Sequence, residues 1–199
     1  MELNTESLPG EIAGLLKMKF NADQAAAVRH IIAFAAREGC TDLRQIAYML
    51  ATAYHEARFL PIREIRAKKG TAVWKMQEKY WHSGYYGRGL CQLTWKKNYQ
   101  KFQDLLGLPL MDNPDLVLDV KVSAEILVVG MLRGLFSGVA LPRYFPPAPA
   151  APLWLSARRT VNGTFQAEKV ADAARKIYVL LSLKKPARWR WRKKVEKKD

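Results

Sequence analysis

The sequence predicts a mainly α-helical domain with a small irregular or β-hairpin element near residues 63–90. Hydrophobic residues form 49% of the 199 residues and aromatic residues 11%, a composition typical of a chain that folds around one core. Apolar residues recur at intervals of three and four along several segments, as they do on the buried face of a helix. Capping residues precede the first two of these segments, and a glycine or a proline follows each of the two.

The first two predicted helices lie between residue 21 and Pro61. Asn21 with Gln24 is typical of an N-terminal cap, and Gly39 stops the helix that follows. Its apolar residues are Ala25, Val28, Ile31, Ile32 and Ala35. A second helix starts near residues 41–42, and Pro61 closes it. Its apolar stripe consists of Leu43, Ile46, Ala47, Leu50 and Tyr54.

The rest of the chain alternates irregular and helical segments. Residues 63–90 carry charges, aromatic rings and several glycines without a clear period, which predicts a structured loop or a short hairpin. Helices are predicted for residues 96–106, 119–136 and 166–183 from their apolar spacing. The Pro/Ala run at residues 146–152 cannot continue a helix and predicts an extended surface connection.

The N-terminal residues Met1–Ser7 lack the basic start and apolar stretch of a signal peptide. Charged residues interrupt the apolar stretch at 122–141, so we expect a buried core helix there rather than a transmembrane segment. The chain is therefore expected to be made without export, with Cys40 and Cys91 as free thiols, although their pairing stays open. The absence of a Cys/His cluster predicts no structural zinc site, and we expect no metal or cofactor.

The formal net charge of +15 is concentrated toward the C-terminus, because residues 184–199 hold nine basic and two acidic residues. We therefore divide the chain into a domain of residues 1–183 and a basic Trp/Arg/Lys tail of residues 184–199. Such a charge favours a polyanionic partner: nucleic acid, a membrane surface or an anionic cell envelope. Charge alone does not choose among them.

Glu56 is the first candidate catalytic residue. It follows His55 at the C-terminal end of the second predicted helix. The negative end of the helix and a partly dry setting both disfavour the charged carboxylate, which suits a general acid that works near neutral pH. The alternative is an ordinary surface glutamate near a helix end, and position alone does not decide between them.

Glu64 is the second candidate carboxylate. Pro61 opposes a continuous helix from Glu56 to Glu64, so the chain can turn and bring the second glutamate back across a cleft. Two carboxylates about 6.5–9.5 Å apart leave room for a water molecule, which is the geometry of an inverting glycosidase. The alternative is an ion pair of Glu64 with a neighbouring base: Arg63, Arg66 or Lys68.

Residues 85–99 alternate aromatic rings with amide and hydroxyl groups after two glycines that permit the close approach of a ligand. Sugars need this mixture, because rings cover their apolar C–H faces while side chains such as Gln92, Thr94 and Asn98 bind hydroxyl and N-acetyl groups. A phosphate-binding loop is the rival interpretation, but the GxxxxGK[ST] pattern is absent. A buried aromatic turn remains the purely structural alternative.

Taken together, these segments resemble glycoside hydrolase family 19, the plant-type chitinases, and in particular its small bacteriophage and prophage endolysin branch. The fragments that carry the resemblance follow the family's order: Ala47–Glu56, Pro61–Glu64, Tyr85–Gly89, Gln92–Tyr99, Asn113–Asp115 and Ala157–Gly163. Their order along much of the chain makes the resemblance specific. It implies a mostly α-helical, lysozyme-like fold with two lobes.

The resemblance also implies a role for each matching residue. Glu56 matches the general acid that protonates the leaving glycosidic oxygen, and Glu64 matches the position of the general base that activates water. Thr94 matches a hydroxyl residue that helps to hold this water, and Arg175 matches a basic residue that tunes the acidic cluster. The remaining matches are expected to contact the substrate: His55, Tyr86, Gln92, Asn98 and Asn162.

These roles predict an endolysin-type peptidoglycan hydrolase that cleaves β-1,4 bonds between MurNAc and GlcNAc and lyses bacteria. We expect a monomer that stays in the host cytoplasm until holin-dependent release to the periplasm and cell wall. The net charge favours anionic peptidoglycan over nearly neutral chitin, although a chitinase stays open as the alternative. A non-catalytic wall-binding protein and a nucleic-acid-binding protein also stay open, but we expect no nucleic acid partner.

The C-terminal tail mixes indole rings with guanidinium groups. Trp189 and Trp191 can lie at a lipid interface while Arg188, Arg190 and Arg192 contact anionic headgroups or lipopolysaccharide. This arrangement predicts contact with an anionic outer membrane. The alternative is a solvated basic tail that only aids solubility.

Overall fold

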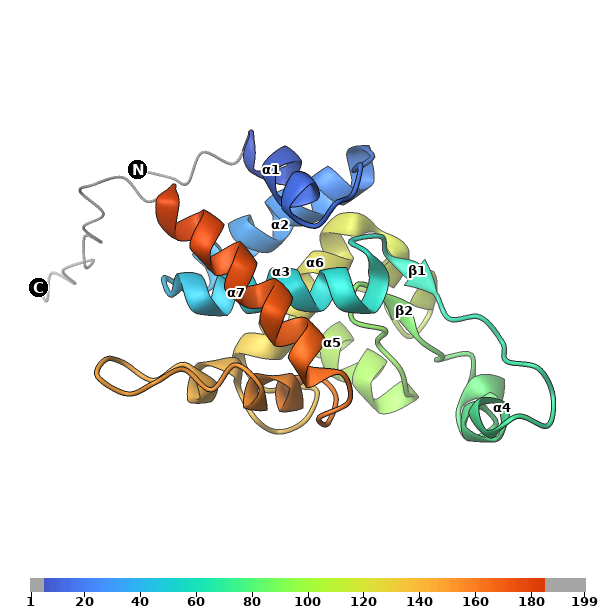
Figure 1. Cartoon of the computed structure of the whole chain (residues 1–199). Helices are drawn as coiled ribbons and strands as arrows, with labels where there is room; N and C mark the ends of the chain where they lie inside the picture. Colours follow the sequence, from blue (N-terminus) through green and yellow to red (C-terminus); the bar gives the residue numbers. More distant parts are fainter. Residues whose placement is uncertain (1–5, 185–199) are drawn as a thin grey trace, which may run out of the picture.

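The computed structural model describes residues 6–184, and within them helices predominate (Figure 1). The α-helices are α1 (Leu8–Leu15), α2 (Ala22–Arg37), α3 (Leu43–Ala57), α4 (Ala72–Gln77), α5 (Lys96–Leu106), α6 (Val120–Leu132) and α7 (Ala167–Leu183). Short 3-10 helices are η1 (Trp81–Ser83), η2 (Pro114–Leu118), η3 (Leu141–Tyr144) and η4 (Ser156–Thr160). Strands β1 (Ile62–Arg63) and β2 (Arg88–Gly89) complete the fold. The predicted mainly α-helical class with a small hairpin element is confirmed.

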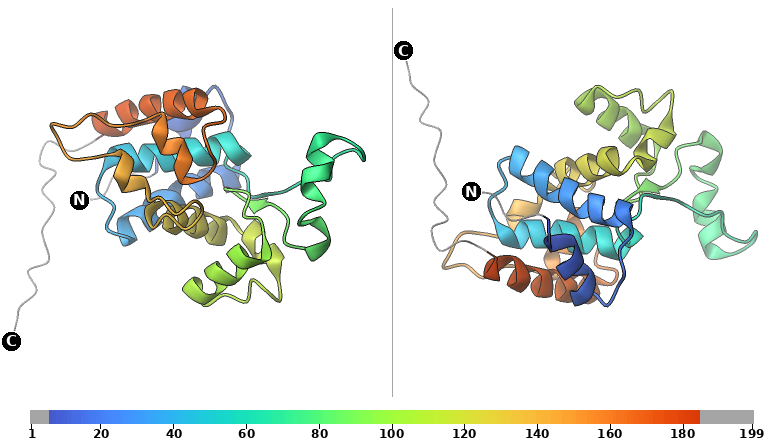
Figure 2. Two further views of the ribbon diagram at one scale, coloured as in Figure 1. Left: turned by 90° about the horizontal axis from the view of Figure 1, so that it is seen from below. Right: turned by 90° about the horizontal axis from the view of Figure 1, so that it is seen from above.

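Helix α3 is the centre of the molecule. It packs most extensively against α7, and α2 packs in the same way against α6 (Figures 1 and 2). Every residue from Ala47 to Ala53 is fully buried, so α3 is surrounded on all sides by the core. A helix buried all round is held rigidly by its neighbours. The C-terminal end of α3 is therefore a fixed platform for the residues it carries.

Local capping explains where the two N-terminal predicted helices begin. The side chain of Asn21 accepts a hydrogen bond from the Gln24 backbone N–H at 2.9 Å, and the Gln24 side chain accepts one from the Asn21 N–H at 2.9 Å. This is the predicted capping box. Asp42 likewise accepts a hydrogen bond from the Arg44 backbone N–H at 2.9 Å.

The end of α3 differs from the prediction that Pro61 closes it. The helix ends at Ala57, because Arg58 and Phe59 take left-handed conformations with φ of 50° and 61°. Phe59 is fully buried, and its ring centroid lies 5.2 Å from that of Phe20. Packing of this side chain into the core thus turns the chain before the proline is reached.

A smaller group of elements stands to one side of the helical body. Strands β1 and β2 pair antiparallel, with Ile62 opposite Gly89 and Arg63 opposite Arg88. Between them the chain runs out to α4, which lies at the end of an arm (Figure 2). This short helix was not predicted, although Thr71 caps it by accepting a hydrogen bond from the Trp74 N–H at 3.2 Å. Helix α1 was also not predicted.

The remaining elements follow the predictions with one shortened helix. The bounds of α5 agree with residues 96–106, and α7 begins one residue later than predicted. Helix α6 ends at Leu132 instead of residue 136, since Gly134 turns the chain in a left-handed conformation with φ of 68°. The Pro/Ala run at residues 146–152 is non-helical and mostly exposed, as predicted.

The predictions for the C-terminal tail, for a membrane span and for the cysteines remain to be compared with the structure. The predicted membrane contacts of Arg188–Arg192 lie outside the described residues. Within residues 6–184, no helix is both long enough and apolar enough to cross a bilayer. Cys40 and Cys91 are both buried and are not joined in a disulfide.

Candidate active site

Glu56 lies at the C-terminal end of α3, where its carboxylate meets a buried cation. Its Oε1 atom is 2.5 Å from Nη2 of Arg158, whose side chain is 2% exposed against 17% for Glu56. The contact is an ion pair rather than a well-directed hydrogen bond, since Oε1 has no hydrogen-bond partner of good geometry. A guanidinium so deeply buried is costly unless a carboxylate faces it. Arg158, in η4, therefore holds the Glu56 carboxylate in position through its buried oxygen, Oε1.

A pocket of about 360 Å³ opens in front of Glu56. Four of the residues predicted to act with Glu56 line it, namely Gln92, Thr94, Asn98 and Asn162. The other lining residues are Cys91, Leu93, Trp95, Phe136 and Val161. Amide, hydroxyl and aromatic groups thus surround one carboxylate, which is the mixture expected of a site that binds a polar ligand with apolar faces.

The polar side chains of this pocket are held by the backbone around them. Gln92 donates its amide hydrogens to the carbonyl oxygens of Ile62 and Gly89, both at 3.0 Å. Thr94 Oγ1 donates to the Gln92 carbonyl oxygen at 2.9 Å, and Asn98 Nδ2 donates to that of Thr94 at 2.8 Å. Such a chain of hydrogen bonds orients the side chains before any ligand arrives.

Two lining residues adopt strained backbone conformations. Gln92 has φ of 53° and Trp95 has φ of 78°, a region that residues other than glycine rarely occupy. Each such conformation costs on the order of 1–3 kcal/mol, and they cluster at functional sites. Their presence in the Glu56 pocket supports its assignment as the active site.

The carboxylate of Glu64 is fully engaged in hydrogen bonds. Oε1 accepts from Nε2 of Gln77 at 2.9 Å and from the hydroxyl of Tyr80 at 2.7 Å, and Oε2 accepts from the Gly87 N–H at 2.9 Å. Burial, followed by the bond to Glu64, raises the pKa of Tyr80, so this hydroxyl stays a donor. The partners of the carboxylate are neutral donors, all from the segment between β1 and β2.

The alternative of an ion pair for Glu64 with its neighbouring bases is contradicted. Arg63 pairs instead with Asp115 at 2.5 Å, and Arg66 pairs with Glu78. No ion pair of Lys68 is found among the residues that the structure describes.

Gly87 lies close to both Glu64 and Gln92, a residue of the Glu56 pocket. A Cβ atom at this position would lie 2.8 Å from Oε1 of Gln92 and 3.2 Å from Oε2 of Glu64. Both oxygens therefore lie close to one point, and Gln92 lines the same pocket as Glu56. Gln92 thus lies close to Glu64 and also lines the pocket of Glu56.

Arg88 was not predicted and organises the backbone beside the site. It is 4% exposed, and its Nε lies 2.7 Å from Oδ1 of Asp115. Its Nη1 donates to the carbonyl oxygens of Gly84 and Tyr86 at 2.9 and 3.1 Å and to the hydroxyl of Tyr99 at 3.1 Å. One buried guanidinium thus fastens the segment before β2 to α5.

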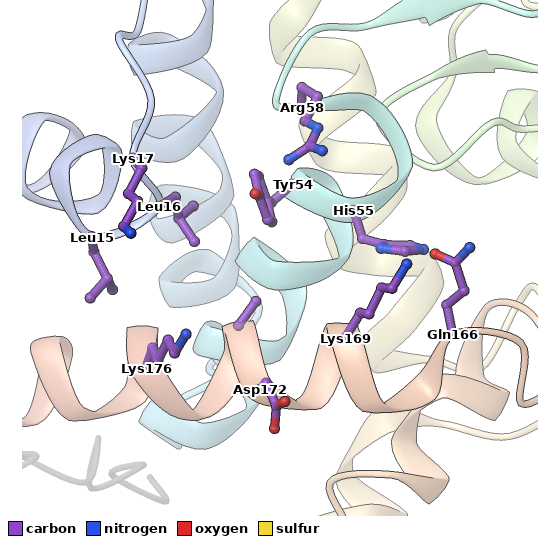
Figure 3. A pocket seen from close by; sticks show the side chains of 11 residues that line it. Leu15, Leu16, Lys17, Tyr54, His55, Arg58, Gln166, Lys169, Asp172 and Lys176 are labelled. Carbon is purple, nitrogen blue, oxygen red and sulfur yellow. The ribbon is translucent and has the colours of Figure 1, made fainter.

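Three of the predicted site residues lie elsewhere. Tyr86 stacks on Trp81, with ring centroids 4.4 Å apart, and does not line the Glu56 pocket. His55 points into a separate pocket between α1, α3 and α7 (Figure 3). The prediction that Arg175 tunes the acidic cluster is corrected, because Arg175 pairs with Asp172 at 2.8 Å and Arg158 is the cation at Glu56.

Sequence comparison decides the family of this chain. Residues 18–129 match the model of glycoside hydrolase family 19, described as chitinase class I. The chain belongs to this family. The match covers both glutamates and the Gln92–Asn98 segment, whereas Arg158 and Asn162 lie beyond it.

Relatives with curated sequences match only part of this chain. An endochitinase of Arabidopsis thaliana is 38% identical over 88 residues, which is 42% of this chain and 30% of that protein. A second Arabidopsis endochitinase is 39% identical over 85 residues, with the same coverage of 42% and 30%. Chitinase 11 of Oryza sativa subsp. japonica is 67% identical over 33 residues, 17% of this chain and 13% of the rice protein. The matched segment thus spans less than a third of each curated relative.

A solved structure shows that the fold extends beyond the matched sequence. The crystal structure of chitinase C from Streptomyces griseus HUT6037 superposes with a TM-score of 0.62 at 19% identity, over 87% of this chain and 76% of that one. A mutant of chitinase C superposes with a TM-score of 0.61 over the same shares of the two chains. The overall fold of this chain is therefore that of chitinase C.

Proposed function

We propose that this chain is a glycosidase that hydrolyses β-1,4 bonds of an amino-sugar polymer by general acid/base catalysis. The observation that carries the proposal is the pocket in which Glu56 faces Gln92, Thr94, Asn98 and Asn162. The family assignment and the hydrogen-bonded second carboxylate, Glu64, support it.

Glu56 serves as the general acid in this proposal. Its Oε1 is buried against Arg158, so the exposed part of the side chain is the part that faces the pocket. A proton on the other oxygen, Oε2, passes to the glycosidic oxygen as the bond to the sugar C1 breaks. The guanidinium then stabilises the carboxylate that remains.

Glu64 serves as the general base. A water molecule attacks C1 from the opposite face and gives a proton to Glu64, and Thr94 helps to hold this water. Tyr80, Gln77 and the Gly87 N–H keep the base in position through the hydrogen bonds that it accepts. Inversion at C1 follows from this arrangement of acid and base on opposite faces.

The polymer that we propose is peptidoglycan, cleaved between MurNAc and GlcNAc by an endolysin-type enzyme. A second pocket, of about 850 Å³, shares Trp95, Asn98 and Phe136 with the Glu56 pocket. Its remaining lining residues are Lys96, Lys97, Lys101, Gly134, Leu135 and Gly138. Peptidoglycan carries carboxylates on its peptide stems, whereas chitin carries none, so lysines beside the active site favour the anionic polymer.

Chitin is the second candidate substrate, because the curated relatives are named endochitinases and chitinase. The two polymers are distinguished by measuring kcat/KM on purified peptidoglycan and on soluble chitooligosaccharides. We expect Lys96→Gln with Lys97→Gln to lower kcat/KM on peptidoglycan about tenfold and to leave the chitooligosaccharide value unchanged. Lys69→Gln with Lys75→Gln, on the arm that carries α4, is the charge-matched control. Equal losses on both substrates would rule out the peptidoglycan proposal.

Release and cell lysis form a further part of the proposal. The chain accumulates in the host cytoplasm, reaches the cell wall after a holin opens the membrane, and contacts lipopolysaccharide through its basic tail. The charge of residues 184–199 supports the last step, with nine basic residues against two acidic ones. Deletion of residues 186–199 is expected to abolish binding to lipopolysaccharide; unchanged binding removes this step.

A further inference from the structure

The pocket that contains His55 is separate from the active site. It has a volume of about 500 Å³, lies between α1, α3 and α7, and shares no lining residue with the Glu56 pocket (Figure 3). Half-buried side chains of Tyr54, His55 and Gln166 form its inner part. None of the proposed catalytic steps uses it.

Four cations surround this pocket. They are Lys17, Arg58, Lys169 and Lys176, contributed by three different parts of the chain (Figure 3). Within residues 6–184, none of these four side chains forms an ion pair with a carboxylate. The one lining carboxylate, Asp172, is directed away from the lysine amines and pairs with Arg175. Four cations against one lining carboxylate, Asp172, leave the pocket with an excess of positive charge.

Three residues at the pocket have the same unusual backbone geometry. Lys17, Arg58 and Gln166 are left-handed, with φ of 54°, 50° and 55°. These conformations are unfavourable for residues with a Cβ, and they persist where the surrounding structure enforces them. Arg58 in particular is fixed, because its carbonyl oxygen accepts a hydrogen bond from Gln24 Nε2 at 2.8 Å and its guanidinium lies over the Tyr54 ring at 4.5 Å.

His55 adds a neutral donor to this charged rim. Burial lowers the pKa of its imidazole, and the nearby cations Arg158, Lys169 and Arg58 act in the same direction against the opposing effect of Glu56. The ring is therefore neutral at physiological pH and can donate one N–H. In Figure 3 the ring lies beside Lys169 and the carboxamide of Gln166.

We propose that this pocket binds a phosphate group, as a phosphomonoester or phosphodiester on a body of about the size of glycerol or a sugar. A phosphomonoester carries close to two negative charges, and the tetrahedral phosphate group of either ester directs its acceptor oxygens toward cations on different sides, which a planar carboxylate does not. The volume exceeds that of a lone ion, so an organic substituent has room beside the phosphate. This site is independent of the glycosidase function.

The test follows backbone amides of Gln166 and Lys169 and the ring of His55 by NMR in the full chain. Sodium phosphate and glycerol 3-phosphate are titrated against sodium chloride and sodium acetate at equal ionic strength, and glycerophosphoglycerol distinguishes a diester from a monoester. We expect saturable shifts with the phosphates, and a rise in the pKa of His55 that His30 and His82 do not show. Equal shifts with chloride or acetate would overturn the proposal.

Matched variants locate the site. Lys169→Gln with Lys176→Gln is expected to weaken phosphate binding about tenfold, because it removes two of the four cations. Lys69→Gln with Lys75→Gln removes the same charge at a distance and is expected to bind as the wild type does. Equal weakening by both pairs contradicts the proposal, and Glu56→Gln should keep phosphate binding whether or not the glycosidase proposal holds.

Discussion

Arg158 and Arg175 are two arginines of one chain that contribute very differently to the stability of the folded state. The Arg158 side chain is 2% exposed and faces Glu56, while Arg175 is on the surface and pairs with Asp172. A buried ion pair contributes most when one partner is removed, because the other is left as an unpaired buried charge. An exposed pair between neighbouring turns of a helix contributes little.

We therefore predict that Arg158→Gln lowers the free energy of unfolding by about 3 kcal/mol. The matched variant Arg175→Gln is expected to change it by less than about 0.5 kcal/mol. Urea denaturation followed by circular dichroism measures both. Equal effects of the two substitutions would contradict the role given to Arg158.

Gly87 is the second residue on which the site depends. A methyl group at this position would lie 2.8 Å from Oε1 of Gln92 and 3.2 Å from Oε2 of Glu64, so it would displace the Gln92 side chain and crowd Glu64. We predict that Gly87→Ala lowers kcat at least tenfold, because a small displacement of catalytic groups is costly in rate. Steady-state hydrolysis of a soluble oligosaccharide measures the effect. Gly14→Ala, where no atom lies within 4 Å of the added Cβ, is the control and should keep full activity.

At the scale of elements, the sequence predicts best where the signal is local. The capping box of Asn21 and Gln24 and the cap at Asp42 placed α2 and α3 correctly. The short helices α1 and α4 were missed, because eight and six residues are too few for a clear apolar period. The end of α3 was misplaced because packing of Phe59, rather than Pro61, decides it.

In the candidate site, too, the features with a local sequence signal were predicted and those that depend on contacts between distant residues were not. The pocket residues Gln92, Thr94 and Asn98 lie in one short segment whose pattern is visible in the sequence. The partner of Glu56 is Arg158, a contact across 102 positions of the chain, and no periodicity indicates such a contact. His55 adjoins Glu56 in sequence, yet consecutive residues of a helix point to different sides, so it enters another pocket.

The capping box gives a prediction at this scale. Asn21→Ala removes the side chain that accepts the Gln24 N–H and should lower the free energy of unfolding by about 1 kcal/mol. Thermal and urea unfolding measure it. Asn21→Asp keeps an acceptor oxygen and serves as the control, so a loss as large as that of the alanine variant would show that the cap is not the cause.

At the scale of the whole molecule, a rigid helical body and a smaller group of elements each contribute one of the two proposed catalytic glutamates. Helix α3, buried along most of its length, presents Glu56, while the hairpin and the arm with α4 present Glu64 and its hydrogen-bond donors. The formal net charge of +15 suits an anionic polymer. The proposed phosphate pocket lies on the α7 side of the same body.

The central claim is that the carboxyl group of Glu56 supplies the proton that breaks the glycosidic bond. The direct measurement is the rate at which purified Glu56→Gln releases new reducing ends from peptidoglycan, compared with wild type and with Glu168→Gln on the surface of α7. Because Glu56→Gln leaves the buried Arg158 unpaired and is expected to be less stable, the rates are compared at a temperature at which circular dichroism shows all three proteins folded. We predict a loss of about 10²- to 10⁴-fold for Glu56→Gln and full activity for Glu168→Gln. Wild-type rates from the Glu56→Gln protein would contradict the mechanism.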